Sequence, residues 1–245
     1  MNKVLKVFLV LLLIIFTYYV TLFSFPSLFL PLKVQKGNLT FYFKHRYEVD
    51  TFCFVDQKKK LNYTYEKIQE SLKISPLYDS TTFRGVILLP DNYLLFDSFA
   101  FFQKHHAAFC LWKIDGQVVI IKEEVCDRMF DETSILITHE LTHKVELEVL
   151  GKMKYAKTPK WLIEGYAEYV SHQGNVNMIF VSSNESEYNR YEVVVAYLLK
   201  VKKYSEITLF NNPPDYETVL TEIKKWRKIN KISINSTPIP QTTTK

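Results

Sequence analysis

The feature that most constrains this chain is a long apolar stretch near its N-terminus. No charged residue occurs from Val7 to Leu32. A helix needs about 20 consecutive apolar residues to cross a bilayer, and the segment Val4–Phe23 supplies them apart from Lys6. We therefore expect residues 1–32 to be a membrane segment that contains one transmembrane helix and precedes the folded part of the protein.

Two interpretations of this stretch remain open, an uncleaved signal anchor and a cleaved signal peptide. The apolar core of a signal peptide usually has about 7–15 residues and is followed by small residues at the cleavage site. The segment Phe23–Ser27 offers no such site, which favours the anchor. Lysines before the stretch favour a cytoplasmic N-terminus. The expected protein is therefore single-pass, with its folded domain on the extracytoplasmic side, or secreted if the segment is cleaved.

Composition leaves room for one globular domain after the apolar stretch. The chain has 245 residues, of which 47% are hydrophobic and 23% are charged, and about 200 residues suffice for a single core. The net charge is +5, but the lysines occur in short scattered runs without interleaved aromatic residues. This pattern is typical of a solvated surface, so we expect no nucleic-acid partner.

The chain has three cysteines, Cys53, Cys110 and Cys126, and no two of them have C-x-x-C spacing. A cysteine zinc site or a thioredoxin-like redox motif is therefore not expected. Outside the cytoplasm one pair could form a disulfide and leave one thiol over. Burial of all three as free thiols is equally consistent with the sequence.

The pattern of apolar residues predicts an α+β fold, in which a small mixed β-sheet is followed by a helical part. The domain is expected over residues 33–232, divided at residue 130, with a disordered polar tail over residues 233–245. Extended segments are expected at 37–50, 84–89, 107–112 and 117–121, the last two joined by a turn at Asp115-Gly116, with a helix at 63–74. Further helices are expected at 131–150 with Asp131 as N-cap, from Thr158-Pro159 to before Gly174, at 191–203 and at 216–228.

The first of these later helices carries the sequence His139-Glu140-Leu141-Thr142-His143. Residues four apart lie on one face of a helix, one turn from each other. Two imidazoles at this spacing can both reach one zinc ion at about 2.0–2.1 Å. Glu140 is placed beside them, within reach of a water at the metal. This H-E-x-x-H pattern predicts a zinc site of a metalloprotease type.

The next predicted helix supplies acidic partners in the segment Trp161–Glu168. Glu164 and Glu168 are again four residues apart and share one face. One carboxylate can complete the protein ligands of the zinc, and the other can accept a hydrogen bond from a ligand imidazole and so hold its tautomer. Gly165 and Ala167 are small enough to let a second helix approach closely.

Together these two segments resemble the gluzincin peptidases, the group that includes thermolysin and the aminopeptidase N family. The resemblance covers residues 131–170 well and 188–200 loosely. It implies a zincin-like domain in which Glu164 is the third zinc ligand and Glu168 supports a ligand histidine. The segment Gly116–Glu124 lacks the Gly-x-Met-Glu-Asn strand with which aminopeptidases of this group bind a free amine, so an endopeptidase is favoured.

Three protein ligands leave one position at zinc open, as in catalytic sites. Glu140 would then act as general base on water and pass the proton to the leaving amine. In the resembling families a downstream tyrosine or histidine stabilises the oxyanion. Tyr191 is the favoured candidate and Tyr188 the alternative, although both are also consistent with packing residues.

The predicted function is thus a membrane-anchored zinc metallopeptidase that acts on a peptide or protein substrate. The alternative is a tethered zinc-binding domain that binds a partner without catalysis. Glu140 argues against that alternative, because zinc binding alone does not need it. Zinc is the only cofactor indicated, and His45, His105, His106 and His172 are assigned no role. The pattern predicts neither the natural substrate nor the oligomeric state.

Overall fold

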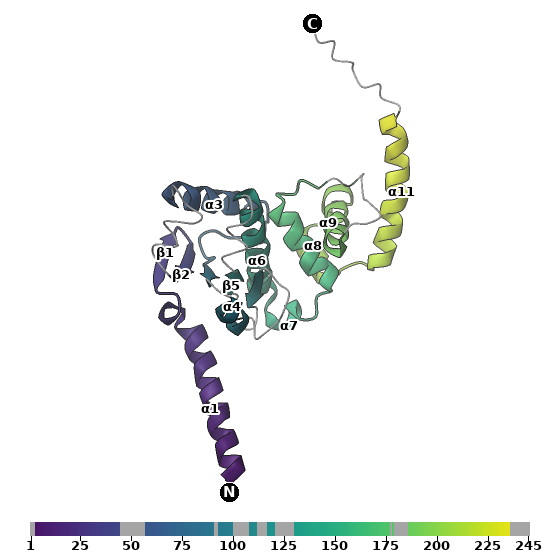
Figure 1. The fold of residues 1–245 in the computed structure, drawn as a ribbon. Coiled ribbons are helices and arrows are strands. Elements are labelled where there is room, and N and C mark those ends of the chain that lie inside the picture. Colours follow the sequence, from purple (N-terminus) through teal and green to yellow (C-terminus); the bar gives the residue numbers. More distant parts are fainter. Residues whose placement is uncertain are drawn as a thin grey trace. The chain divides into compact units, whose positions relative to one another are not determined.

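The computed structural model describes residues 3–44, 57–90, 93–99, 108–111, 117–120, 130–176, 178 and 186–235. The chain divides into two compact units, Met1–Tyr155 and Ala156–Lys245. The first unit holds the β-sheet and the second is helical among its described residues (Figure 1).

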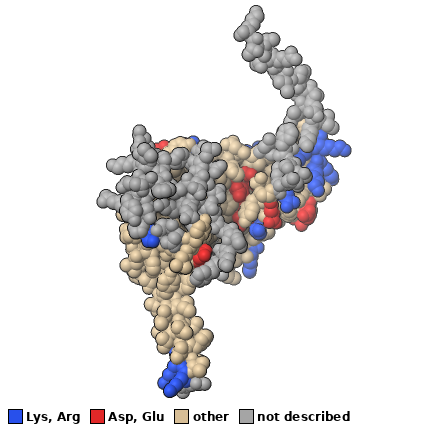
Figure 2. Space-filling model, viewed as in Figure 1, with Lys and Arg blue, Asp and Glu red and all other residues tan. Residues whose placement is uncertain are grey.

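The first unit begins with α1 (Lys3–Ser24), which is long and apolar enough to cross a membrane. A signal sequence near an N-terminus shares this property, so length and composition alone do not separate the two. On the face drawn in Figure 2, the lysines at the N-terminal tip are the only charged side chains along α1. Pro26 cannot donate a backbone hydrogen bond, and a 3₁₀ turn, η1 (Pro26–Leu28), follows α1.

The sheet of the first unit has five strands in the spatial order β1-β2-β3-β5-β4. The two outer pairs are antiparallel, whereas β2 pairs with β3 and β3 with β5 in parallel. The sheet is therefore small and mixed, as expected. The strands are β1 (Leu32–Lys36), β2 (Leu39–Phe43), β3 (Gly85–Leu89), β4 (Ala108–Leu111) and β5 (Gln117–Ile120).

One long helix of the first unit packs on this sheet. The helices are α3 (Gln57–Leu72), α4 (Tyr93–Phe99), α6 (Phe130–Leu150) and α7 (Lys152–Tyr155). α6 contacts α3, β4 and β5. A Cβ atom on Gly85 would lie 3.0 Å from Leu141 Cδ2 and 2.5 Å from Leu39 Cδ2. A glycine at the start of β3 thus leaves the space that the middle of α6 occupies.

In the second unit, the first two helices form the main packing pair. The elements are α8 (Lys160–Ser171), α9 (Glu187–Ala196), the π-helical turn η2 (Tyr197–Val201), α10 (Glu206–Asn211) and α11 (Tyr216–Asn235). A Cβ atom on Gly165 would lie 2.5 Å from the carbonyl oxygen of Tyr191. Gly165 therefore permits a close helix approach, as expected, and within this unit the helix that comes close is α9. Tyr166 is fully buried, and its ring lies 5.2 Å from that of Phe210.

Several boundaries differ from the prediction. α6 begins at Phe130, so Asp131 lies inside its first turn and the predicted N-cap is wrong. α11 continues to Asn235, so residues 233–235 are helical and the predicted start of the disordered tail is wrong. The short elements β1, α4, α7 and α10 were not predicted.

Some predicted features fall outside the described residues. These are the Asp115-Gly116 turn, Cys53, Cys126, His45, His105 and His106. Cys110, which is described, carries a free thiol.

Candidate metal centre

The H-E-x-x-H segment lies in the middle of α6, where the helix is buried around most of its circumference. His139, Glu140 and His143 are 9%, 7% and 6% exposed. Two threonines in the same stretch are buried at no polar cost, because each hydroxyl donates to a carbonyl one turn earlier: Thr138 Oγ1 to Ser134 O at 2.7 Å and Thr142 Oγ1 to Thr138 O at 2.8 Å. The two histidines and the glutamate of this segment are therefore buried polar side chains on a largely buried helix.

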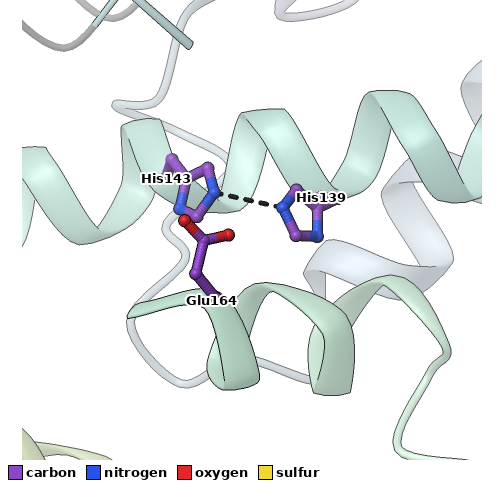
Figure 3. Close-up of side chains that lie close together, drawn as sticks. All are labelled: His139, His143 and Glu164. Carbon is purple, nitrogen blue, oxygen red and sulfur yellow. Dashed lines mark hydrogen bonds between the residues drawn. The ribbon is translucent and has the colours of Figure 1, made fainter. Parts of the chain in front are cut away.

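The Nε2 atoms of the two imidazoles point toward each other across one helical turn. The Nε2 atoms of His139 and His143 are 3.1 Å apart, and the rings are almost perpendicular, at 88° (Figure 3). Two nitrogens that bind one tetrahedral zinc at about 2.0–2.1 Å lie roughly 3.3 Å from each other. The pair therefore already has the spacing that a shared metal ion requires.

Glu164 of α8 joins this pair, as predicted. One ligand atom from each of His139, His143 and Glu164 lies within 4.8 Å of the others. Figure 3 shows the Glu164 carboxylate directed toward the imidazoles. Two imidazole nitrogens and one carboxylate oxygen are donors that zinc accepts, and three protein ligands leave room for a further one. This cluster can hold a metal ion.

A buried carboxylate that the sequence analysis missed holds one of the imidazoles. Glu146 is fully buried, and its Oε2 lies 3.0 Å from Nδ1 of His143. A proton on Nδ1 donated to this carboxylate leaves the lone pair of Nε2 for a metal ion. The sequence shows that Glu146 follows His143 by one helical turn on the same face, but it does not show that Glu146 is buried.

The sequence analysis gave this supporting role to Glu168. Its Oε2 lies 3.7 Å from Nδ1 of His172, the C-cap residue of α8. The same nitrogen lies closer, at 2.7 Å, to Oε1 of Glu192 in α9. His172, to which no role was assigned, therefore connects the end of α8 to α9. Support of a ligand histidine by Glu168 stays a prediction.

Of the two oxyanion candidates, Tyr191 lies close in space to the residue next to Glu164. Its backbone lies against Gly165, next in sequence to Glu164. Its hydroxyl donates to Glu187, and burial together with this carboxylate raises the pKa of Tyr191 to about 12. The ring of Tyr188 lies beneath Nζ of Lys160, at 5.5 Å. The oxyanion role stays a prediction for both.

Comparison of the chain with protein-family models, with curated proteins and with solved structures gives no match. Any chemical assignment therefore depends on the residues of this chain and their arrangement.

Proposed function

We propose that this chain is a membrane-anchored zinc peptidase that hydrolyses peptide bonds within a chain rather than at its amino end. One observation carries the proposal: ligand atoms of His139, His143 and Glu164 lie within 4.8 Å of one another, and Glu140 lies between the two histidines on the same helix. The resemblance of both segments to gluzincin peptidases agrees with this assignment.

In this proposal the residues of the chain have distinct tasks. His139 and His143 bind the metal ion through Nε2, Glu164 binds it through its carboxylate, and Glu146 orients His143. A zinc ion held there supplies Lewis acidity and lowers the pKa of a bound water to about 7. Glu140 takes the proton of the attacking water and returns it to the leaving amine, so that the amine departs neutral.

The proposal favours catalysis over metal-dependent partner binding because of Glu140. Two histidines and one carboxylate suffice to bind zinc, so a structural site does not need a carboxylate beside the first histidine. The membrane part of the proposal is supported by α1, which is long and apolar enough to cross a bilayer. We propose that the remainder of the chain lies on the extracytoplasmic side.

Metal content tests the site. The full chain, purified in detergent, should contain one zinc per molecule, and His139→Ala should lose it. His172→Ala is a matched control, because this histidine pairs with Glu192 and should leave the zinc content unchanged. A native chain without zinc after exposure to the metal would overturn the proposal.

Cleavage of a fluorescence-quenched peptide library tests the chemistry. Glu140→Gln should retain zinc and lose activity by about 100-fold or more, the contribution typical of a positioned general base. Glu148→Gln is the control, since Glu148 lies on the same helix but is exposed and pairs with Lys144 at 2.9 Å. Zinc without cleavage in the native chain would point to the non-catalytic alternative.

A further inference from the structure

The last turn of α1 belongs to the hydrophobic core of the first unit. Leu22 and Phe23 are 0% and 8% exposed, and the ring of Phe23 lies 5.9 Å from that of Phe99 in α4. The core cluster that contains them is Leu22, Phe23, Leu30, Leu88, Phe96, Phe99, Leu111 and Val119. Helix and folded unit are therefore joined by packing rather than by a flexible linker.

This packing shortens the part of α1 that a bilayer can receive. At 1.5 Å per residue, the uncharged part of α1 before the core, Val7–Thr21, is about 22 Å long. The hydrocarbon region of a bilayer is about 30 Å thick. A short span is compensated when flanking apolar residues enter the interface or when the bilayer thins. Apolar residues of the first unit beside the end of α1 would complete this span by entering the interface.

Exposed apolar side chains lie on the surface next to the end of α1, as contact with lipid would require. Phe25 and Leu28, in and beside η1, are 59% and 69% exposed. At the start of α4, Leu94 is 74% exposed, while Phe96 and Phe99 of the same helix are in the core with Phe23. Figure 1 shows α4 beside the end of α1 that enters the unit.

Aromatic and basic residues near the same end of α1 fit a membrane interface. The rings of Tyr18 and Phe29 lie 6.0 Å apart, and Tyr18 is 40% exposed. Tyrosine is enriched where a spanning helix leaves the hydrocarbon region. Lys33 follows within the exposed start of β1, where a cation can meet lipid headgroups.

We propose that η1 and the start of α4 form a membrane-seated surface, whose Phe25, Leu28 and Leu94 enter the interface of the bilayer that α1 crosses. The occupant of this apolar surface is lipid, because the surface is continuous with α1. It follows that α1 is retained in the mature protein, since its removal would take Leu22 and Phe23 out of the core. The inference rests on the membrane part of the proposed function and is independent of the zinc chemistry.

Quenching by brominated lipid tests this surface in the full chain. Phe25→Trp and Leu94→Trp, reconstituted in phosphatidylcholine vesicles, should lose most of their added fluorescence when the acyl chains carry bromine near the headgroup, because interfacial side chains lie about 5–10 Å into the bilayer. Ile74→Trp is the control, at a position 37% exposed beyond the end of α3. Its added fluorescence should remain.

Quenching of Phe25→Trp and Leu94→Trp no greater than that of Ile74→Trp would overturn the inference. The mass of the native chain isolated from membranes provides a measurement free of substitutions: a chain that begins after Ser24 would also overturn it. Failure of the zinc proposal would look different, because a chain without zinc or cleavage would still show the quenching.

Discussion

At the scale of single residues, the candidate centre depends on how one imidazole is held. Glu146 contacts Nδ1 of His143 at 3.0 Å and is itself fully buried. A carboxylate in this position fixes the orientation of the ring and increases its basicity toward a metal ion. Presentation of His143 Nε2 to a metal ion would therefore depend on a further residue of the same helix, Glu146.

Replacing Glu146 should weaken metal binding without removing a ligand. We expect Glu146→Leu to lower zinc affinity by about 10–100-fold, the usual effect of losing a hydrogen-bond acceptor behind a ligand histidine. Glu146→Gln keeps an acceptor oxygen and should lose less. Competition with a fluorescent chelator measures both, with Glu148→Gln as the control on the same helix. Equal affinities for the native chain and Glu146→Leu would show that Glu146 does not support the site.

The candidate ligand pair could be predicted from sequence because helical periodicity alone places His139 and His143 on one face. The predicted partner, Glu164, does lie with them. Glu146 was missed because glutamates are common on helix surfaces, and spacing does not reveal that this one is fully buried. His172 was missed because its partner, Glu192, is distant in sequence.

At the scale of elements, the His172 pair connects α8 to α9 and makes this packing depend on pH. A hydrogen bond from His172 to Glu192, with Glu168 nearby, raises the pKa of His172 above 6.5 although partial burial opposes it. Protonated His172 also lies at the C-terminus of α8, where positive charge is favourable. The folded state therefore binds the proton more tightly than the unfolded chain does.

This raised pKa predicts how the pair contributes to stability. The contribution is fully present below the unfolded pKa, near 6.5, and is lost as the pH rises through the higher folded pKa. Because His172 is 35% exposed, it should amount to about 1 kcal/mol or less. Urea unfolding in detergent at about pH 6 and pH 9 should show that Glu192→Gln is more destabilising at the lower pH. A destabilisation that grows with pH would contradict this, and in a His172→Asn background the pH dependence should disappear.

Helices and strands were predicted correctly where the apolar periodicity was strong, and they were missed where tertiary contacts determine the secondary structure. The apolar spacing of Ile68 and Leu72 predicted α3, and the β-branched runs predicted β3 and β5. β1 was missed because it directly follows the apolar stretch assigned to residues 1–32, and its short alternation of lysines and a glutamine with apolar residues was not recognised as an edge strand. α4 has only seven residues, and its core side chains are distinguished by their contacts rather than by a repeating pattern.

At the scale of the whole molecule, α1 is both a candidate membrane span and a source of core residues. Its middle is exposed, as a lipid-facing helix should be, whereas Leu22 is fully buried in the first unit. Sequence could predict the apolar stretch but not this division, because a leucine facing lipid and a leucine facing a core have the same hydropathy. The folding of the first unit is therefore coupled to the end of α1.

Two matched substitutions in α1 should reveal this coupling. Leu22→Ala removes fully buried side-chain volume and should lower the free energy of unfolding by about 2–5 kcal/mol, as cavity-forming leucine substitutions do. Leu12→Ala makes the same chemical change at a position 46% exposed, where detergent or lipid fills the space. Thermal unfolding of the full chain in the same detergent should therefore lower the Tm for Leu22→Ala and leave it nearly unchanged for Leu12→Ala. Equal shifts would mean that the end of α1 is not part of the core, and that the folded unit is tethered to its anchor rather than packed on it.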